Sequence, residues 1–131
     1  MWFANWRAED VYQLVRSKSV HVEQTEIRRL EVIETEAYDR VLLQDGELQI
    51  ATDANVAVHE AMVHPALLTH DDPTDVLIIG GGDGGSTREI LKYDPGRVDL
   101  VEIDERVIEV SREYFPGFAT DFDDDRVNVH I

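Results

Sequence analysis

The chain has 131 residues, of which 43% are hydrophobic, and it carries a formal net charge of −16 at pH 7. It contains no cysteine, which excludes disulfides and thiolate metal sites, and no run of about 18 apolar residues that could span a membrane. The acidic balance repels nucleic acid and anionic membranes, so we exclude both as partners.

The charge also bears on the environment of the protein. Asp and Glu total 28 against 12 basic residues, and the only lysines are Lys18 and Lys92. Halophilic proteins carry high net charge of this kind, so we hypothesise adaptation to a salty cytoplasm, with an ordinary acidic protein as the alternative. Residues 1–7 lack the basic and then apolar pattern of a signal peptide, which predicts a cytoplasmic location.

Short β-strands are predicted for the amino-terminal part. Residues 1–7 are rich in aromatic side chains and are expected to form an edge segment or a lid, whereas residues 10–16 fit a helical turn or a strand equally well. Asp45-Gly46, between two apolar runs within residues 41–50, predicts a β-hairpin. Apolar residues among charged neighbours indicate a further strand: Ile27, Leu30, Val32 and Ile33. We therefore expect a small antiparallel β domain over residues 1–55.

A helix is predicted next, from about Val56 to Thr69. Asp53 or Asn55 can serve as its N-cap, and Pro65 should kink it by removing one backbone hydrogen bond. Its apolar positions are Val58, Met62, Val63 and Leu67. Residues 70–74 form the loop that leads to the next strand.

The stretch from Val76 to Asp104 has the order strand, glycine loop, helix, strand, acid. The apolar run Val76–Ile79 predicts a strand buried on both faces, as in a parallel sheet. Residues Ser86–Tyr93 have the length of a helix, capped by Ser86 or Thr87. This order is typical of the first βαβ unit of a Rossmann-like nucleoside site.

The spacing of the glycines supports that interpretation. Gly80, Gly82 and Gly85 match G-x-G-x-x-G, and Glu102 lies 20 residues after Gly82, where a carboxylate can accept hydrogen bonds from both ribose hydroxyls. The alternative is a glycine-rich turn that binds no ligand.

Asp83 indicates which ligand the loop prefers. A dinucleotide would place its pyrophosphate over this loop, where the carboxylate of Asp83 would repel it. A cationic group such as a sulfonium or an ammonium would instead be attracted. The sequence therefore favours an adenosyl sulfonium compound over a dinucleotide.

The remaining residues extend the same pattern. A helix is predicted over residues 105–115, a solvated acidic loop over residues 121–125 and a third strand over residues 127–131. Three parallel strands leave an open sheet edge and apolar helix faces with little cover, which suggests a truncated chain, self-association or marginal stability. The predicted fold is α/β: a small amino-terminal antiparallel β region, then a truncated Rossmann-like, methyltransferase-type parallel sheet over residues 56–131.

Two other kinds of site are not expected. His59 and His64 are five residues apart, whereas a zinc helix needs a spacing of four to place both histidines on one face. Metal ligands are therefore not assigned. No Ser–His–Asp pattern stands out in the sequence either.

Several of these segments together resemble the spermidine synthases, the polyamine aminopropyltransferases. The matching motifs are Asp45-Gly46, His59-Glu60, Leu67-Leu68-Thr69-His70, residues 76–85, Arg88-Glu89 and Val101-Glu102-Ile103-Asp104. The resemblance covers nearly all of this chain but only about half of a typical family member.

The resemblance implies transfer of an aminopropyl group from decarboxylated S-adenosylmethionine to putrescine or a related amine, without a metal or further cofactor. By this analogy Glu102 would hold the ribose and Asp83 would face the aminopropyl ammonium. Glycines 80 to 85 would line the nucleoside pocket, with His59 beside it. The expected partners are a polyamine and an adenosyl donor, and either a second copy of the chain or a full-length relative.

The chain also departs from the family. Val58 stands where the family has an amine-binding tyrosine, and Arg28 where it has a glutamine. The family's Gly-Asp-Gly and Asp-Ser-x-Asp-Pro segments, the second of which supplies the base, would follow Ile131, so we assign no catalytic residue. Two alternatives remain: a methyltransferase that uses intact S-adenosylmethionine, and a non-catalytic truncated product that binds a nucleoside.

Overall fold

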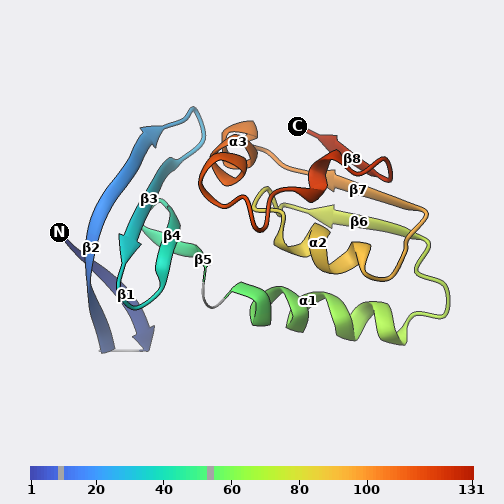
Figure 1. The fold of residues 1–131 in the computed structure, drawn as a ribbon, viewed down its shortest axis with the longest axis horizontal. Helices are drawn as coiled ribbons and strands as arrows, with labels where there is room; N and C mark the ends of the chain where they lie inside the picture. The colour runs from blue at the N-terminus through green and yellow to red at the C-terminus, as the bar shows by residue number, and fades with distance from the viewer. Residues whose placement is uncertain (9–10, 53–54) are drawn as a thin grey trace. The chain divides into compact units, whose positions relative to one another are not determined.

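The computed structural model describes residues 1–8, 11–52 and 55–131. The chain divides into two compact units, Met1–Ala54 and Asn55–Ile131. The regular elements among the described residues of the first unit are all strands, whereas the second unit alternates helices and strands (Figure 1).

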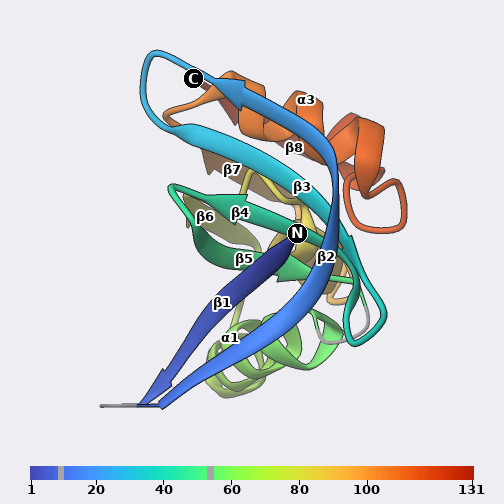
Figure 2. The ribbon, with the colours of Figure 1, turned by 90° about the vertical axis from the view of Figure 1, so that its left-hand side faces the viewer.

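The first unit contains a five-stranded antiparallel sheet in which each strand pairs with the next one in sequence (Figure 2). Its strands are β1 (Trp2–Ala8), β2 (Val11–Gln24), β3 (Arg29–Thr35), β4 (Asp39–Gln44) and β5 (Glu47–Ala51). The predicted antiparallel β region is therefore confirmed. Of the two alternatives for residues 1–7, an edge strand is the one observed, and residues 11–16 belong to a strand rather than a helical turn. Asp10 lies outside the described residues.

The predicted hairpin between β4 and β5 is also confirmed. Asp45 and Gly46 both have positive φ, 51° and 84°, as a type I′ turn requires. The Asp45 side chain accepts a hydrogen bond from the Arg29 backbone N–H (N···Oδ1 2.8 Å), which ties the turn to the neighbouring strand β3.

Both faces of this sheet bury apolar side chains. One face carries a core of Val15, Ile33, Val41, Leu43 and Ala51, with Tyr38 and Leu48 packed against it. The opposite face carries four side chains with no exposed surface: Leu30, Val32, Leu42 and Ile50. Because neighbouring residues of a strand point to opposite faces, this small sheet is apolar on both sides.

The second unit is built on a three-stranded parallel sheet in the order β6-β7-β8. Its elements are α1 (Asn55–Thr69), β6 (Asp75–Ile79), α2 (Gly85–Leu91), β7 (Arg97–Val101), α3 (Glu105–Tyr114), a 3₁₀ helix (Asp121–Asp123) and β8 (Val127–His130). The predicted parallel Rossmann-like sheet and its third strand are confirmed. Residues 121–125, expected to form a solvated loop, instead include the 3₁₀ helix, whose Phe122 is buried.

The core of this unit lies on one face of the sheet. Ile78, Val98 and Leu100 from the strands pack with Val63 of α1, Ile90 of α2 and Ile108 of α3, together with Ala119 and Phe122. Asp104 begins α3, because its side chain accepts a hydrogen bond from the Arg106 backbone N–H (3.1 Å).

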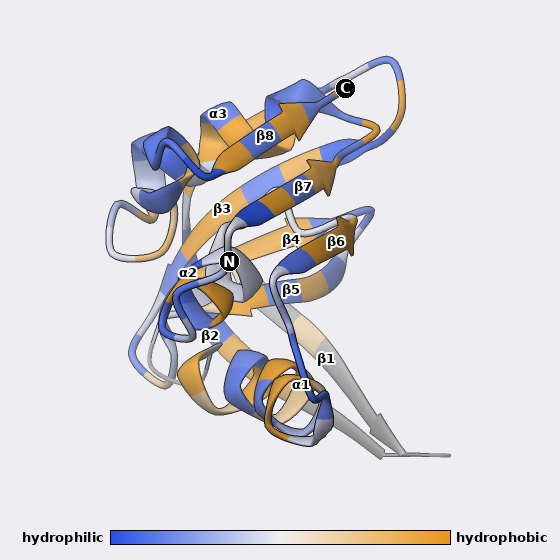
Figure 3. Cartoon of the chain, turned by 90° about the vertical axis from the view of Figure 1, so that its right-hand side faces the viewer, coloured by the Kyte–Doolittle hydropathy of each residue, from blue (hydrophilic) through white to orange (hydrophobic). Residues whose placement is uncertain are grey.

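The opposite face of the sheet is open in the described residues. Leu77, Ile79 and Val101 are 61%, 85% and 41% exposed, and Figure 3 shows apolar stretches on these strands. The prediction that Val76–Ile79 is buried on both faces is therefore wrong for this chain. The strands follow one another in space as in sequence, so right-handed crossovers place α2 and α3 on the same face.

The apolar face predicted for α1 is only partly correct. Val63 is buried and Leu67 packs against the core, but Val58 and Met62 are exposed. Pro65 lies within the helix. The N-cap predictions remain open for Asp53, which lies outside the described residues, whereas Asn55 is already the first residue of the helix.

Candidate functional site

Glu102 lies immediately after β7 and is joined to the glycine loop that follows β6. Its Oε2 accepts a hydrogen bond from the Gly82 backbone N–H (3.0 Å), and its Oε1 accepts one from the Asp104 N–H (3.2 Å). The residue is only 5% exposed. These two backbone hydrogen bonds hold the side chain in place. Since each carboxylate oxygen has two acceptor positions, the carboxylate can still accept hydrogen bonds from two ribose hydroxyls.

Gly82 is needed for this contact. A Cβ atom at Gly82 would lie 2.9 Å from Glu102 Oε2 and 3.1 Å from a methyl group of Val107. Gly80 extends the pairing of β6 with β7, because its N–H donates to the Val101 carbonyl (2.8 Å). The structure therefore brings together Gly80, Gly82 and Glu102, which the sequence pattern had grouped.

Asp83 lies two residues before the helix that follows the loop and binds the first backbone N–H of that helix. Its Oδ1 accepts a hydrogen bond from the Gly85 backbone N–H (2.7 Å), and Gly84 has φ 83°, which turns the chain into α2 at Gly85. The prediction that Ser86 or Thr87 caps this helix is wrong. Left-handed backbone at Gly84 lets the helix begin before either hydroxyl can act as a cap.

His59 packs from α1 against the same turn. Its Nδ1 lies 3.3 Å from Ser86 Oγ, and its Nε2 lies 3.7 Å from Asp83 Oδ1. The ring occupies space that only glycine leaves open, because a Cβ atom at Gly85 would lie 2.2 Å from ring atoms of His59. His59, Asp83 and Gly85 thus lie together, as expected if all three line the predicted nucleoside pocket.

Ser86 is the residue that sequence reasoning missed. It is 8% exposed and completes a Ser–His–Asp cluster that was not expected from the sequence. Ser86 and His59 are 27 residues apart, and no local pattern reports that α1 packs on α2. One indication that Ser86 belongs to the site was present in the sequence, namely that it follows Asp83 by three residues.

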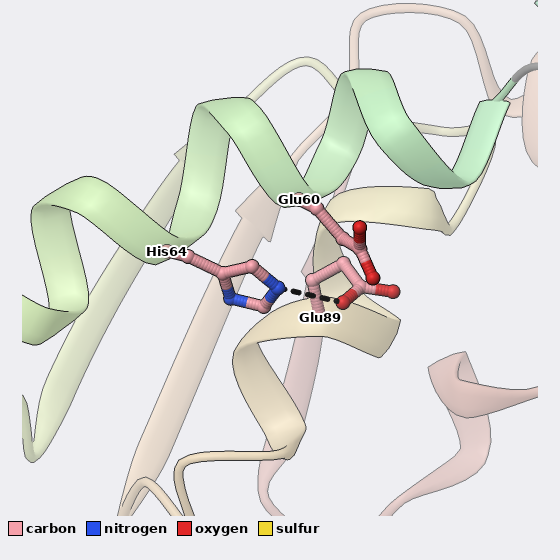
Figure 4. Close-up of side chains that lie close together, drawn as sticks. All are labelled: Glu60, His64 and Glu89. Atoms are coloured by element: carbon pink, nitrogen blue, oxygen red, sulfur yellow. Dashed lines mark ion pairs between the residues drawn. The ribbon is translucent and has the colours of Figure 1, made fainter.

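A second polar cluster joins the same two helices (Figure 4). The ligand atoms of Glu60, His64 and Glu89 lie within 4.8 Å of one another, with His64 Nε2 3.3 Å from Glu89 Oε2. The Tyr93 hydroxyl lies 2.8 Å from His64 Nδ1.

Positively charged side chains of the chain itself neutralise the buried carboxylate of this second cluster. The carboxylate of Glu89 has no exposed surface, accepts a hydrogen bond from Arg88 Nε (2.9 Å) and pairs with the Lys92 ammonium. Burial alone would raise the pKa of Glu89, but hydrogen bonds from Lys92 and then Arg88 outweigh it and lower the pKa. We therefore interpret the cluster as an ion-pair network between α1 and α2; the absence of metal ligands stays a prediction.

None of the described helices is long and apolar enough to cross a membrane.

Comparison with known proteins matches this chain to one family. The model of the spermine/spermidine synthase domain matches residues 55–131. A polyamine aminopropyltransferase of Bacillus mycoides is 38% identical over 133 aligned residues, which cover all of this chain and 48% of that protein. The chain therefore spans about half the length of the curated relatives it matches.

Solved structures of the same family have the same fold. The crystal structure of spermidine synthase from Thermotoga maritima matches with a TM-score of 0.94 at 31% sequence identity. The match covers all of this chain and 47% of the Thermotoga maritima chain. A spermidine synthase in complex with the transition state analogue AdoDATO matches equally well, with the same TM-score, identity and coverage. The resemblance inferred from the motifs is confirmed: the chain belongs to the spermine/spermidine synthase family.

Proposed function

We propose that this chain provides the donor-binding part of a polyamine aminopropyltransferase, which transfers an aminopropyl group from decarboxylated S-adenosylmethionine to putrescine or a related amine. The observation that supports this most directly is the pairing of Glu102 with the Gly82 N–H beside the carboxylate of Asp83. One acid is suited to ribose hydroxyls, and the other is suited to a cation.

The proposed reaction is a direct displacement. The neutral nitrogen of the amine attacks the carbon next to the sulfonium, a C–N bond forms as the C–S bond breaks, and methylthioadenosine leaves. Holding the donor in one orientation supplies part of the acceleration. The attacking amine must also lose a proton to a base, and we assign that role to none of the described residues.

Asp83 distinguishes this proposal from a methyltransferase. The intact methyl donor carries a carboxylate that the decarboxylated donor lacks, and a carboxylate near Asp83 would be repelled. The side chain of Asp83 is 19% exposed, so a ligand can reach it. The decarboxylated donor is therefore the better match in charge.

Association with a second polypeptide also stays a prediction, supported by the exposed face formed by Leu77, Ile79 and Val101.

Calorimetric titration of the chain with three ligands tests the proposal. Decarboxylated S-adenosylmethionine should bind about tenfold or more tightly than methylthioadenosine, and more tightly than intact S-adenosylmethionine. Asp83→Asn should remove most of that preference and change methylthioadenosine binding less than about twofold, since hydrogen bonds to charged groups contribute about 1.5–3 kcal/mol.

Two results would contradict it. Tighter binding of intact S-adenosylmethionine would favour the methyltransferase alternative. No binding of any of the three nucleosides would favour a glycine turn without a ligand.

A further inference from the structure

The His59 ring is held between two groups that approach its two nitrogens. Ser86 Oγ lies 3.3 Å from Nδ1, and Asp83 Oδ1 lies 3.7 Å from Nε2. The residue is 5% exposed, and the Gly85 backbone lies directly against the ring. Rotation of the imidazole is therefore restricted on both sides and on one face.

The Asp83 carboxylate bears on which tautomer of the His59 ring is preferred. A neutral imidazole has one N–H and one acceptor nitrogen. If the acceptor nitrogen faced the Asp83 carboxylate, two sets of lone pairs would oppose each other. The arrangement that avoids this opposition has Ser86 donating its hydroxyl proton to Nδ1 and the ring N–H on Nε2, on the side of Asp83. Ser86 thereby favours the tautomer that the carboxylate needs.

Asp83 has one oxygen committed to this arrangement. Its contacts with the described residues, to the Gly85 N–H and to His59, both involve Oδ1. This leaves Oδ2 of a partly exposed carboxylate for a ligand. We propose that Ser86 is a positioning residue, which acts through His59 to hold the Asp83 carboxylate toward the cationic end of the bound nucleoside.

This inference rests on the proposed function, because it assigns Asp83 to the ammonium of the donor. The proposed displacement gives Ser86 no nucleophilic role, because the amine itself attacks the donor carbon; the residue is 8% exposed and its Oγ lies 3.3 Å from the His59 ring. Its effect is therefore expected on ligand preference, through geometry.

The experiment compares two ligands that differ in charge. The affinities of the chain for decarboxylated S-adenosylmethionine and for methylthioadenosine are measured by calorimetry, and their ratio is the readout. Ser86→Ala should reduce the ratio about three- to tenfold, as expected for one neutral hydrogen bond. Methylthioadenosine, which has no ammonium group, should bind within about twofold of the wild-type affinity.

Two variants serve as controls. Ser86→Thr keeps a hydroxyl and should restore the ratio. Thr87→Val removes the neighbouring hydroxyl on the same turn, which is fully buried and has no hydrogen-bond partner among the described residues. It should leave the ratio unchanged.

A double-mutant cycle tests the route through His59. If Ser86 acts through the ring, Ser86→Ala added to His59→Gln should lower the ratio no further than His59→Gln alone. Additive losses would overturn the inference, and so would an equal loss of both ligands in Ser86→Ala, which indicates a general structural role. A wild-type chain with no preference for the cationic ligand would instead contradict the proposed function itself.

Discussion

At the scale of single residues, the site depends on carboxylates that are held by backbone N–H groups. Glu102 accepts from Gly82 and Asp104, and Asp83 accepts from Gly85. Backbone donors add no charge of their own, so both side chains keep their negative charge available to a ligand. A buried carboxylate held in this way is suited to hydroxyl donors, and a more exposed one to a cation.

Removal of the Glu102 carboxylate should weaken nucleoside binding. Glu102→Ala is expected to lower the affinity for methylthioadenosine at least tenfold, because two hydrogen bonds to a charged acceptor are lost. Glu105→Ala, which removes the same charge from an exposed position on the first turn of α3, should bind as the wild type does. Calorimetric titration of both variants measures the difference, and an unchanged affinity in Glu102→Ala would reject the assignment.

At the scale of secondary structure, the turn before β8 is held by Arg126, which forms ion pairs with Asp124 and with Asp94. Asp124 accepts hydrogen bonds from the Arg126 guanidinium (2.8 Å) and from the Arg126 backbone N–H (3.0 Å). The guanidinium, and then the backbone N–H, lower the pKa of Asp124 from 3.8 to about 2. The folded chain therefore keeps this carboxylate charged at a pH where the unfolded chain protonates it.

The stability contributed by this turn should be lost in acid. Between about pH 4 and pH 2 the unfolded state binds more protons at Asp124, so the free energy of unfolding falls as the pH falls. Asp124→Asn should be less stable than the wild type above pH 4, and the difference should shrink toward pH 2. Asp125→Asn, at the exposed neighbouring position, should parallel the wild type. Urea unfolding at several pH values gives both curves; a constant difference for Asp124→Asn would contradict this account.

Element types and order were largely predictable because their causes are local. Asp45-Gly46 specifies a tight turn wherever strands flank it. The apolar run of β6 and the alternation of apolar and polar residues in β8 identify both as strands. The start of α2 was not predictable in the same way. Ser86 and Thr87 are both good cap residues, but the backbone at Gly84 began the helix before them.

At the scale of the whole molecule, the net charge of −16 is the dominant feature. Like charges on one folded chain repel each other, and salt screens that repulsion over a Debye length of about 10 Å at 0.1 M and about 3 Å at 1 M. If the protein is adapted to a salty environment, its melting temperature should rise between low and molar KCl. Thermal unfolding followed by circular dichroism measures this, and a flat response would remove the halophile hypothesis.

The chain also leaves one face of its parallel sheet exposed, and here the sequence misled. An all-apolar strand predicts burial on both faces, yet Leu77 and Ile79 are exposed because the crossover helices lie on one side. The strand was identified correctly, but its surroundings depend on elements distant in the sequence. The chain spans about half the length of its relatives, so an apolar strand here need not find its cover within these 131 residues.

The sequence by itself determined the order strand, glycine loop, helix, strand, acid, and with it the position of Glu102 at the end of the second strand; the hydrogen bond from Gly82 to Glu102 is seen only in the structure. Turn chemistry, hydrophobic periodicity and the distance from a loop to the end of the next strand are all properties of a short segment. Only the tertiary structure decided that His59 reaches Ser86 and Asp83, and that His64 belongs to a separate network with Glu89. Those contacts depend on how α1 packs against α2, and packing is governed by the shape of the whole core rather than by any local pattern.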